Sequence, residues 1–117
     1  MIQRFRRNNI ANPGASATDV IVYDESAAGV ADINTARVVV AGRFDQIVTL
    51  KAYWCATGLD ADLVERSSVA LAVNTVVEAD VRLLPGRNKV TMTTTTACTV
   101  WQCAVETTDD VSAGGVA

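Results

Sequence analysis

The chain has 117 residues, of which 50% are hydrophobic and 20% charged, and its net charge is −3. This length suits one domain with a modest core. Aromatic residues make up only 5%, so the core must consist mainly of Val, Ala, Leu and Ile. The weakly acidic charge disfavours extensive nucleic-acid binding. No apolar run approaches the roughly 18 residues of a membrane span, and the N-terminal segment lacks the apolar stretch of a signal peptide.

The charge is unevenly distributed along the chain. Residues 1–18 carry three arginines and no acidic residue, whereas the remainder carries 7 basic and 13 acidic residues. The first 17 residues are polar and include a Pro-Gly pair. We therefore predict an extended N-terminal arm over residues 1–17, a β-sandwich domain over 18–107 and a C-terminal tail over 108–117.

We expect the basic arm to bind a partner. Arg4, Arg6 and Arg7 would face acidic side chains of that partner, and Phe5 and Ile10 would act as apolar anchors. A basic segment ahead of an acidic body is typical of electrostatic docking.

The rest of the chain reads as a series of short strands with turn signals between them. In chain order the predicted strands are 18–26, 36–41, 46–56, 68–73, 76–84, 88–94 and 99–107. A spacing of about 8–12 residues is typical of an all-β sandwich or barrel. The predicted fold is an antiparallel β-sandwich, jelly-roll or immunoglobulin-like, with about seven or eight strands.

Alternating polarity predicts which side chains are buried, because successive residues of a strand point to opposite faces. The predicted inward residues are Val48, Leu50, Ala52 and Trp54; Val77, Ala79, Val81 and Leu83; and Trp101, Cys103 and Val105. Pro85-Gly86 suits a type II turn. We expect the last two strands to form a hairpin around residues 95–98.

The sequence offers few residues for chemistry. It has no histidine, so a Ser or Cys nucleophile paired with His is excluded. Asp60, Asp62 and Glu65 fall in an acidic loop at 57–66, where solvated charge with one helical turn is the expected structure. We predict no enzyme activity, no catalytic residue, no metal site and no cofactor.

The three cysteines, Cys55, Cys98 and Cys103, lack metal-ligand spacing. We expect them to be small buried apolar side chains. A Cys55–Cys103 bridge between two sheets is geometrically open, but synthesis in the cytoplasm argues against it.

Part of the chain resembles small β-sandwich virion proteins of tailed bacteriophages. The resemblance rests on the segment RVVVAGRFDQIVTLKAYW, the acidic loop after it, and then VVEADVRLLPGRNKVTMTTTTACTVWQCAVE. The resemblance covers about residues 36–107. Those proteins usually carry a DGG-x-x-W turn, and 57–60 here reads TGLD instead. The resemblance implies a capsid decoration or cement protein that stabilises the phage head by bridging neighbouring capsid subunits.

The implied partners are the major capsid protein or other virion subunits. A homo-oligomer such as a trimer would be compatible, with no membrane or nucleic-acid partner, in a virion assembled in the host cytoplasm. One alternative is a neck, tail or head-spike component. Another, from a different class, is a carbohydrate-binding or adhesin module that uses Tyr53 and the threonine-rich hairpin.

Overall fold

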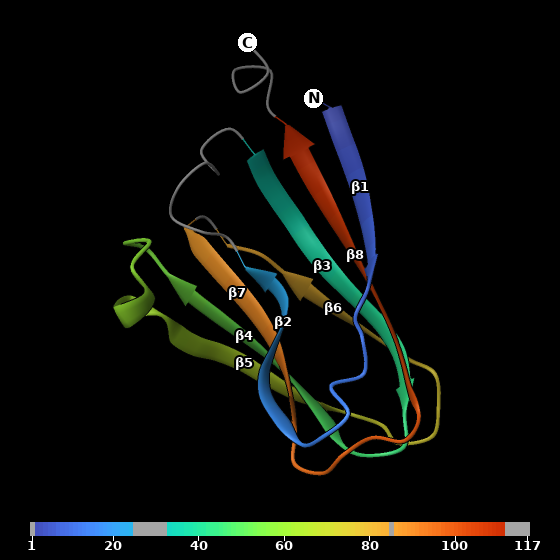
Figure 1. Cartoon of the computed structure of the whole chain (residues 1–117). Helices are drawn as coiled ribbons and strands as arrows, with labels where there is room; N and C mark the ends of the chain where they lie inside the picture. The colour runs from blue at the N-terminus through green and yellow to red at the C-terminus, as the bar shows by residue number, and fades with distance from the viewer. Residues whose placement is uncertain (1, 25–32, 85, 112–117) are drawn as a thin grey trace.

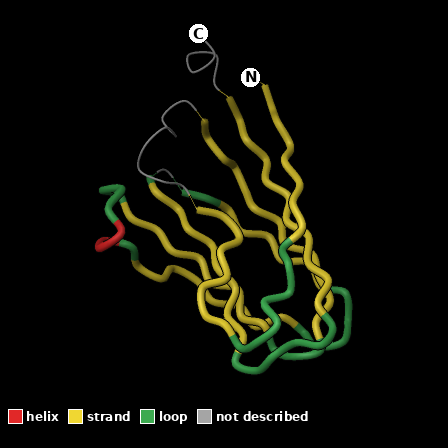
Figure 2. The backbone as a smooth tube through the Cα atoms, in the orientation of Figure 1, coloured by secondary structure: helices red, strands yellow, loops and turns green. Residues whose placement is uncertain are grey.

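The computed structural model describes residues 2–24, 33–84 and 86–111. This part of the chain contains eight strands, one 3-10 turn at Asp60–Asp62 and no α-helix. The strands are β1 (Ile2–Asn9), β2 (Ala17–Asp24), β3 (Ile33–Phe44), β4 (Val48–Cys55), β5 (Val64–Leu71), β6 (Val77–Arg82), β7 (Arg87–Thr94) and β8 (Trp101–Val111). They form the two facing layers seen in Figures 1 and 2.

The strand order defines a jelly roll. Sheet A has the order β1-β8-β3-β6 and sheet B the order β2-β7-β4-β5, and all pairs are antiparallel. The first strand therefore pairs with the eighth, the second with the seventh, the third with the sixth and the fourth with the fifth. Such a rolled-up long hairpin is the jelly-roll arrangement. The predicted all-β sandwich is confirmed, and the order distinguishes between the two architectures expected.

The predicted arm is wrong for residues 2–9. Ile2–Asn9 form β1, which pairs in register with β8 of the same chain from Ile2↔Val111 to Asn9↔Ala104. The sandwich thus begins at Ile2 and continues to Val111, beyond the predicted limits of 18 and 107. Residues 112–117 of the predicted tail lie outside the described residues.

The predicted C-terminal hairpin is also wrong. β7 belongs to sheet B and β8 to sheet A, so the chain crosses between sheets at residues 95–100. Turn signals show where a strand ends, but they do not show in which layer the next strand lies. Strand limits also differ, most clearly in β3, which continues through Gly42 to Phe44, and in β5, which begins at Val64 rather than at residue 68.

The core lies between the two sheets and follows the predicted alternation except at the end of β4, where Trp54 is only half-buried and the next residue, Cys55, is buried. The β4·β5 ladder has a register shift between Ala52 and Tyr53, just before these residues. In β4, Val48, Leu50 and Ala52 are buried, while Thr49 and Lys51 on the other face are only half-buried. Phe44 is fully buried at the end of β3, and its ring meets Trp101 edge-on with centroids 4.8 Å apart. The buried apolar residues are Val38, Val40, Phe44, Val48, Leu50, Ala52, Cys55, Leu71, Val81, Leu83, Val90, Met92, Cys98, Cys103 and Val105.

Asp45 joins the β3–β4 turn to the segment before β8. Its carboxylate accepts hydrogen bonds from the Thr99 backbone N–H at 3.0 Å and from the Thr99 hydroxyl. The backbone N–H of Asp45 donates to the carbonyl of Val100 at 3.3 Å. The side-chain hydrogen bond from Thr99 is the main reason that the pKa of Asp45 lies below its ordinary value of 3.8.

Truncating Phe44 should destabilise the fold strongly. Phe44→Ala should lower the free energy of unfolding by about 3–5 kcal/mol, because it leaves a cavity in a closely packed core. Ile47 provides the control because it lies three residues away and is 57% exposed. Ile47→Ala should change the free energy of unfolding by less than about 0.5 kcal/mol. Urea denaturation measures both, and equal effects would contradict the assigned core.

Asp45 should make stability sensitive to acid. Because its folded-state pKa is lowered, its contribution is present above the ordinary pKa and is lost as the pH falls below that value. Asp45→Asn and Thr99→Ala should both flatten the fall in unfolding midpoint between about pH 5 and pH 2. Thermal unfolding across this range measures the effect, and slopes equal to that of the unchanged protein would refute it.

Candidate functional site

The basic N-terminal strand lies beside acidic residues of its own chain. The register places Arg4 opposite Asp109 and Arg7 opposite Glu106. Arg7 Nε donates to Glu106 Oε2 at 2.8 Å, on a surface where the Arg7 side chain is 81% exposed. The acidic surface expected on a partner is thus supplied, at least for Arg7, by β8.

Ile10 is placed against its own sandwich. It packs on the core, its backbone N–H donates to the Cys103 carbonyl at 3.0 Å, and its carbonyl accepts from Trp101 Nε1 at 2.8 Å. The side chains of Arg4, Phe5 and Arg6 lie outside the described part of the structure. A partner-binding role for Arg4, Phe5, Arg6, Arg7 and Ile10 therefore stays a prediction.

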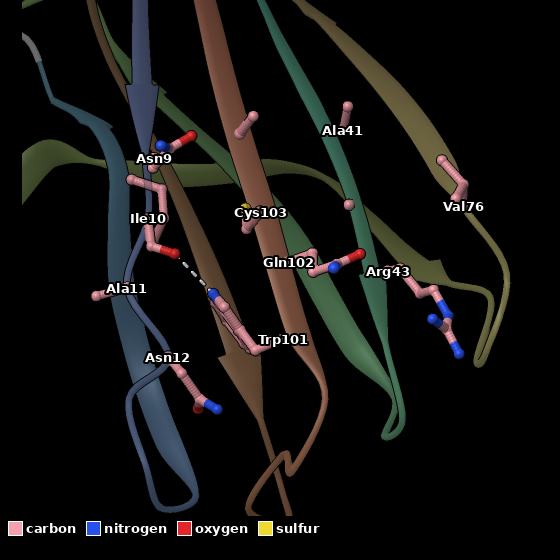
Figure 3. Close-up of a pocket in the computed structure, with 12 residues that line it drawn as sticks. Asn9, Ile10, Ala11, Asn12, Ala41, Arg43, Val76, Trp101, Gln102 and Cys103 are labelled. Atoms are coloured by element: carbon pink, nitrogen blue, oxygen red, sulfur yellow. Dashed lines mark hydrogen bonds between the residues drawn. The ribbon is translucent and has the colours of Figure 1, made fainter.

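An open depression of about 570 Å³ lies over sheet A near the end of β1 (Figure 3). Ala41 of β3 and Ala104 of β8 are register partners there, and their methyl groups leave the space open. Asn9, Arg43 and Gln102 contribute amide and guanidinium groups to its lining. The arrangement suits binding through hydrogen bonds and apolar contact. The predicted alternation in β8, with Trp101, Cys103 and Val105 inward, leaves Gln102 and Ala104 on the outer face. It does not show that β1 lies beside them.

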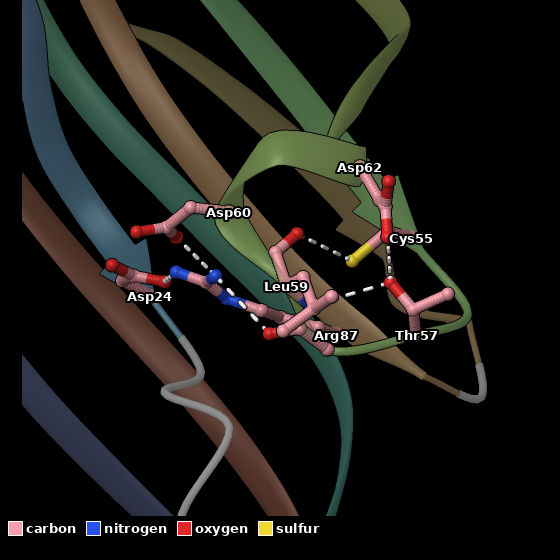
Figure 4. A network of polar contacts seen from close by, with 8 residues as sticks. Asp24, Cys55, Thr57, Leu59, Asp60, Asp62 and Arg87 are labelled. Atoms are coloured by element: carbon pink, nitrogen blue, oxygen red, sulfur yellow. Dashed lines mark hydrogen bonds and ion pairs between the residues drawn. The ribbon is translucent and has the colours of Figure 1, made fainter.

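A second polar cluster ties three segments of sheet B together (Figure 4). Arg87, at the start of β7, pairs with Asp24 of β2 at 3.1 Å and with Asp60 of the β4–β5 loop. It also donates to the Gly58 carbonyl at 3.4 Å. These hydrogen bonds, first that to Asp24 and then that to Asp60, raise the pKa of the guanidinium. The cluster holds the acidic loop against the sheet, and the predicted helical turn at Asp60–Asp62 is confirmed.

All three cysteines are buried and free, as predicted for small apolar side chains. Burial raises the pKa of Cys103 to about 11 and also raises that of Cys98. Both thiols are therefore protonated at neutral pH, whereas the reactive form of a cysteine is the thiolate. Cys103 Sγ lies 3.8 Å from Met92 Sδ within the core.

The surface proposed for carbohydrate binding is not formed as expected. β7 and β8 lie in different sheets, and Thr91 and Thr94 of β7 are buried. Within residues 2–24, 33–84 and 86–111, no three His, Cys, Asp or Glu side chains gather where they could hold a metal ion. No helix in the described residues is long and apolar enough to cross a membrane.

Comparison with known proteins supports the fold. No protein-family model and no curated protein matches the chain. The PBSX exported protein XepA is similar in structure, with a TM-score of 0.62 and 10% identity over 92% of this chain, which spans only 37% of XepA. A subunit from a structure described as Bacillus endospore appendages, a family of disulfide-linked pili, matches with a TM-score of 0.53 and 16% identity over 94% of this chain and 87% of that one.

Removing the indole N–H of Trp101 should loosen the segment that follows β1. Trp101→Phe should lower the free energy of unfolding by about 1 kcal/mol, because the Ile10 carbonyl loses its donor. Hydrogen exchange should also quicken at residues 10–12. If both the exchange and the unfolding free energy stay unchanged, this hydrogen bond does not hold the segment.

Proposed function

We propose that this chain is a structural subunit of a phage or appendage particle. In the more specific form of the proposal it decorates or cements a phage capsid by bridging neighbouring subunits. The fold supports the general form, since the two similar structures are an exported phage protein and a pilus-type appendage subunit. Jelly rolls are common in viral shells.

The observation that carries the proposal is the open side of the sandwich between β5 and β6. Val69 of β5 pairs with the buried Leu50, so it lies on the inner face of sheet B, yet it is 52% exposed. Every residue of β5 except Leu71 is exposed. A depression of about 120 Å³ opens here and is lined by residues of β4, β5 and β6.

An uncovered apolar border of this kind suits contact with a neighbouring subunit. Val64 at the start of β5 is 58% exposed, and Val76 just before β6 is 79% exposed. Exposed apolar side chains beside an edge strand invite association. In a particle, an adjacent subunit would cover them.

The copy number of the chain in purified particles tests this function. Quantitative mass spectrometry should find the chain in phage or appendage particles from the cells that encode it. Hundreds of copies per particle would support decoration, whereas about a dozen or fewer would support a neck, tail or head-spike position, because the symmetry of each location sets the number of copies. Absence of the chain from all such particles would overturn the proposal.

Deleting the N-terminal residues is a poor test of partner binding. The deletion would remove β1 from sheet A, so lost binding would report a damaged fold. Arg4→Ala and Arg6→Ala leave the strand backbone in place and are the appropriate variants.

A further inference from the structure

We propose that the chain binds a second copy of itself head to tail, with β1 of one copy pairing antiparallel to β6 of the next. Arg7 of the first copy would then lie opposite Asp80 of the second. This inference rests on the proposed structural role and names the surface and partner through which the chain assembles.

The backbone of β1 presents unused pairing groups on its outer side. The Ile10 N–H donates to Cys103 of β8, and pairing direction alternates along an antiparallel strand. The backbone groups of Arg7 and Asn9 therefore point away from β8. In the described part of the chain, no strand lies on that side of β1.

The backbone of β6 presents matching groups at the opposite border. The Arg82 carbonyl accepts a hydrogen bond from Arg66 of β5 at 2.8 Å, so it points away from β3. By the same alternation, the backbone groups of Asp80 and Glu78 also face outward. Because Arg66 occupies the carbonyl at one end, Asp80 and Glu78 are the positions open to a new strand.

The two borders have complementary charge in the same cross-strand row. The register connects Arg7 to Glu106, Glu106 to Val39 and Val39 to Asp80. A row that begins with arginine and ends with aspartate can continue into the next copy without any offset. The neighbouring row begins at Asn9 and ends at Glu78, which would pair an amide with a carboxylate.

Strand direction and regularity favour sheet A for this contact. Three antiparallel steps separate β1 from β6, so the two strands run in opposite directions and a translated copy pairs antiparallel. The β1·β8 and β3·β6 ladders have no register shift, whereas β2·β7 has two and β4·β5 has one. Bulges hinder strand addition at an edge, so the borders of sheet B are less suited to it.

The side chains are available for the contact. Arg7 uses Nε to bind Glu106, and a guanidinium has five N–H donors, so it can bind a second carboxylate. The side chain of Asp80 is 51% exposed, and its Oδ2 lies 3.4 Å from Nε of Arg37. The contact is heterologous and would generate a ring or a filament, depending on the rotation between copies.

Proline substitutions at the two borders provide the test. Proline is tolerated on an edge strand where its missing N–H would face outward. Asp80→Pro should block β6 and Arg7→Pro should block β1, while Asp80→Ala and Arg7→Ala keep the backbone donors. In sedimentation velocity the unchanged protein should form oligomers, and each proline variant should raise the dissociation constant at least about tenfold, more than its alanine counterpart.

Mixing the two proline variants makes the test specific. Each retains one intact border, so the mixture should form a 1:1 dimer that grows no further, while each variant alone stays monomeric. If Asp80→Pro fails to fold by circular dichroism, Asp80→Arg replaces it and should weaken association through repulsion from Arg7; if Arg7→Pro fails, Arg7→Glu replaces it and should weaken association through repulsion from Asp80. High salt should weaken assembly of the unchanged protein.

Two results would overturn the inference: an unchanged protein that stays monomeric up to about 1 mM, or folded border variants that assemble as well as the unchanged protein. Either result would leave the proposed function standing if the chain is still found in particles. Absence from particles would remove the proposed function whatever the purified chain does.

Discussion

The antiparallel ladder between β3 and β8 is the interaction on which sheet A depends. It runs from Ile33↔Val111 to Phe44↔Trp101, with one register shift near Thr35. β1 is attached to the sheet only through β8, and β6 only through β3, within the described residues. The same ladder brings Phe44 against Trp101 and places Val38, Val40, Cys103 and Val105 over the core. Its two strands come from distant parts of the chain, so sheet A depends on long-range pairing and not on a local hairpin.

The molecule buries its apolar surface unevenly, and this explains why its borders are the regions of functional interest. The buried side chains gather between β3, β4, β7 and β8, whereas β5 leaves Val69 of its inner face exposed. A small domain buries a smaller fraction of its surface on folding than a large one. A neighbouring subunit would stabilise such an edge, because it would remove apolar area from water and pair with the open backbone groups.

Much of the fold could be predicted because alternation depends only on neighbouring residues. Seven strands, the inward positions of Val48, Leu50 and Ala52, the helical turn in the acidic loop and the burial of the cysteines followed from local pattern. Trp54 did not follow it, since it is only half-buried. β1 was missed because arginines and asparagines dominate it, and such a segment alone looks like a solvated arm. Its partner is a strand about 100 residues away that carries Glu106, Asp109 and Asp110, and no local rule connects the two.

The sequence by itself determined a small all-β chain with Val-rich inner faces and a basic beginning, because composition and period-two alternation are properties of adjacent residues. Only the tertiary structure decided that this beginning is an edge strand of its own sandwich. Only it placed β7 and β8 in different sheets, and set Arg7 and Asp80 at opposite ends of one row. The sheet to which a strand belongs, the strand beside it and their register depend on pairing between segments that are far apart in the sequence.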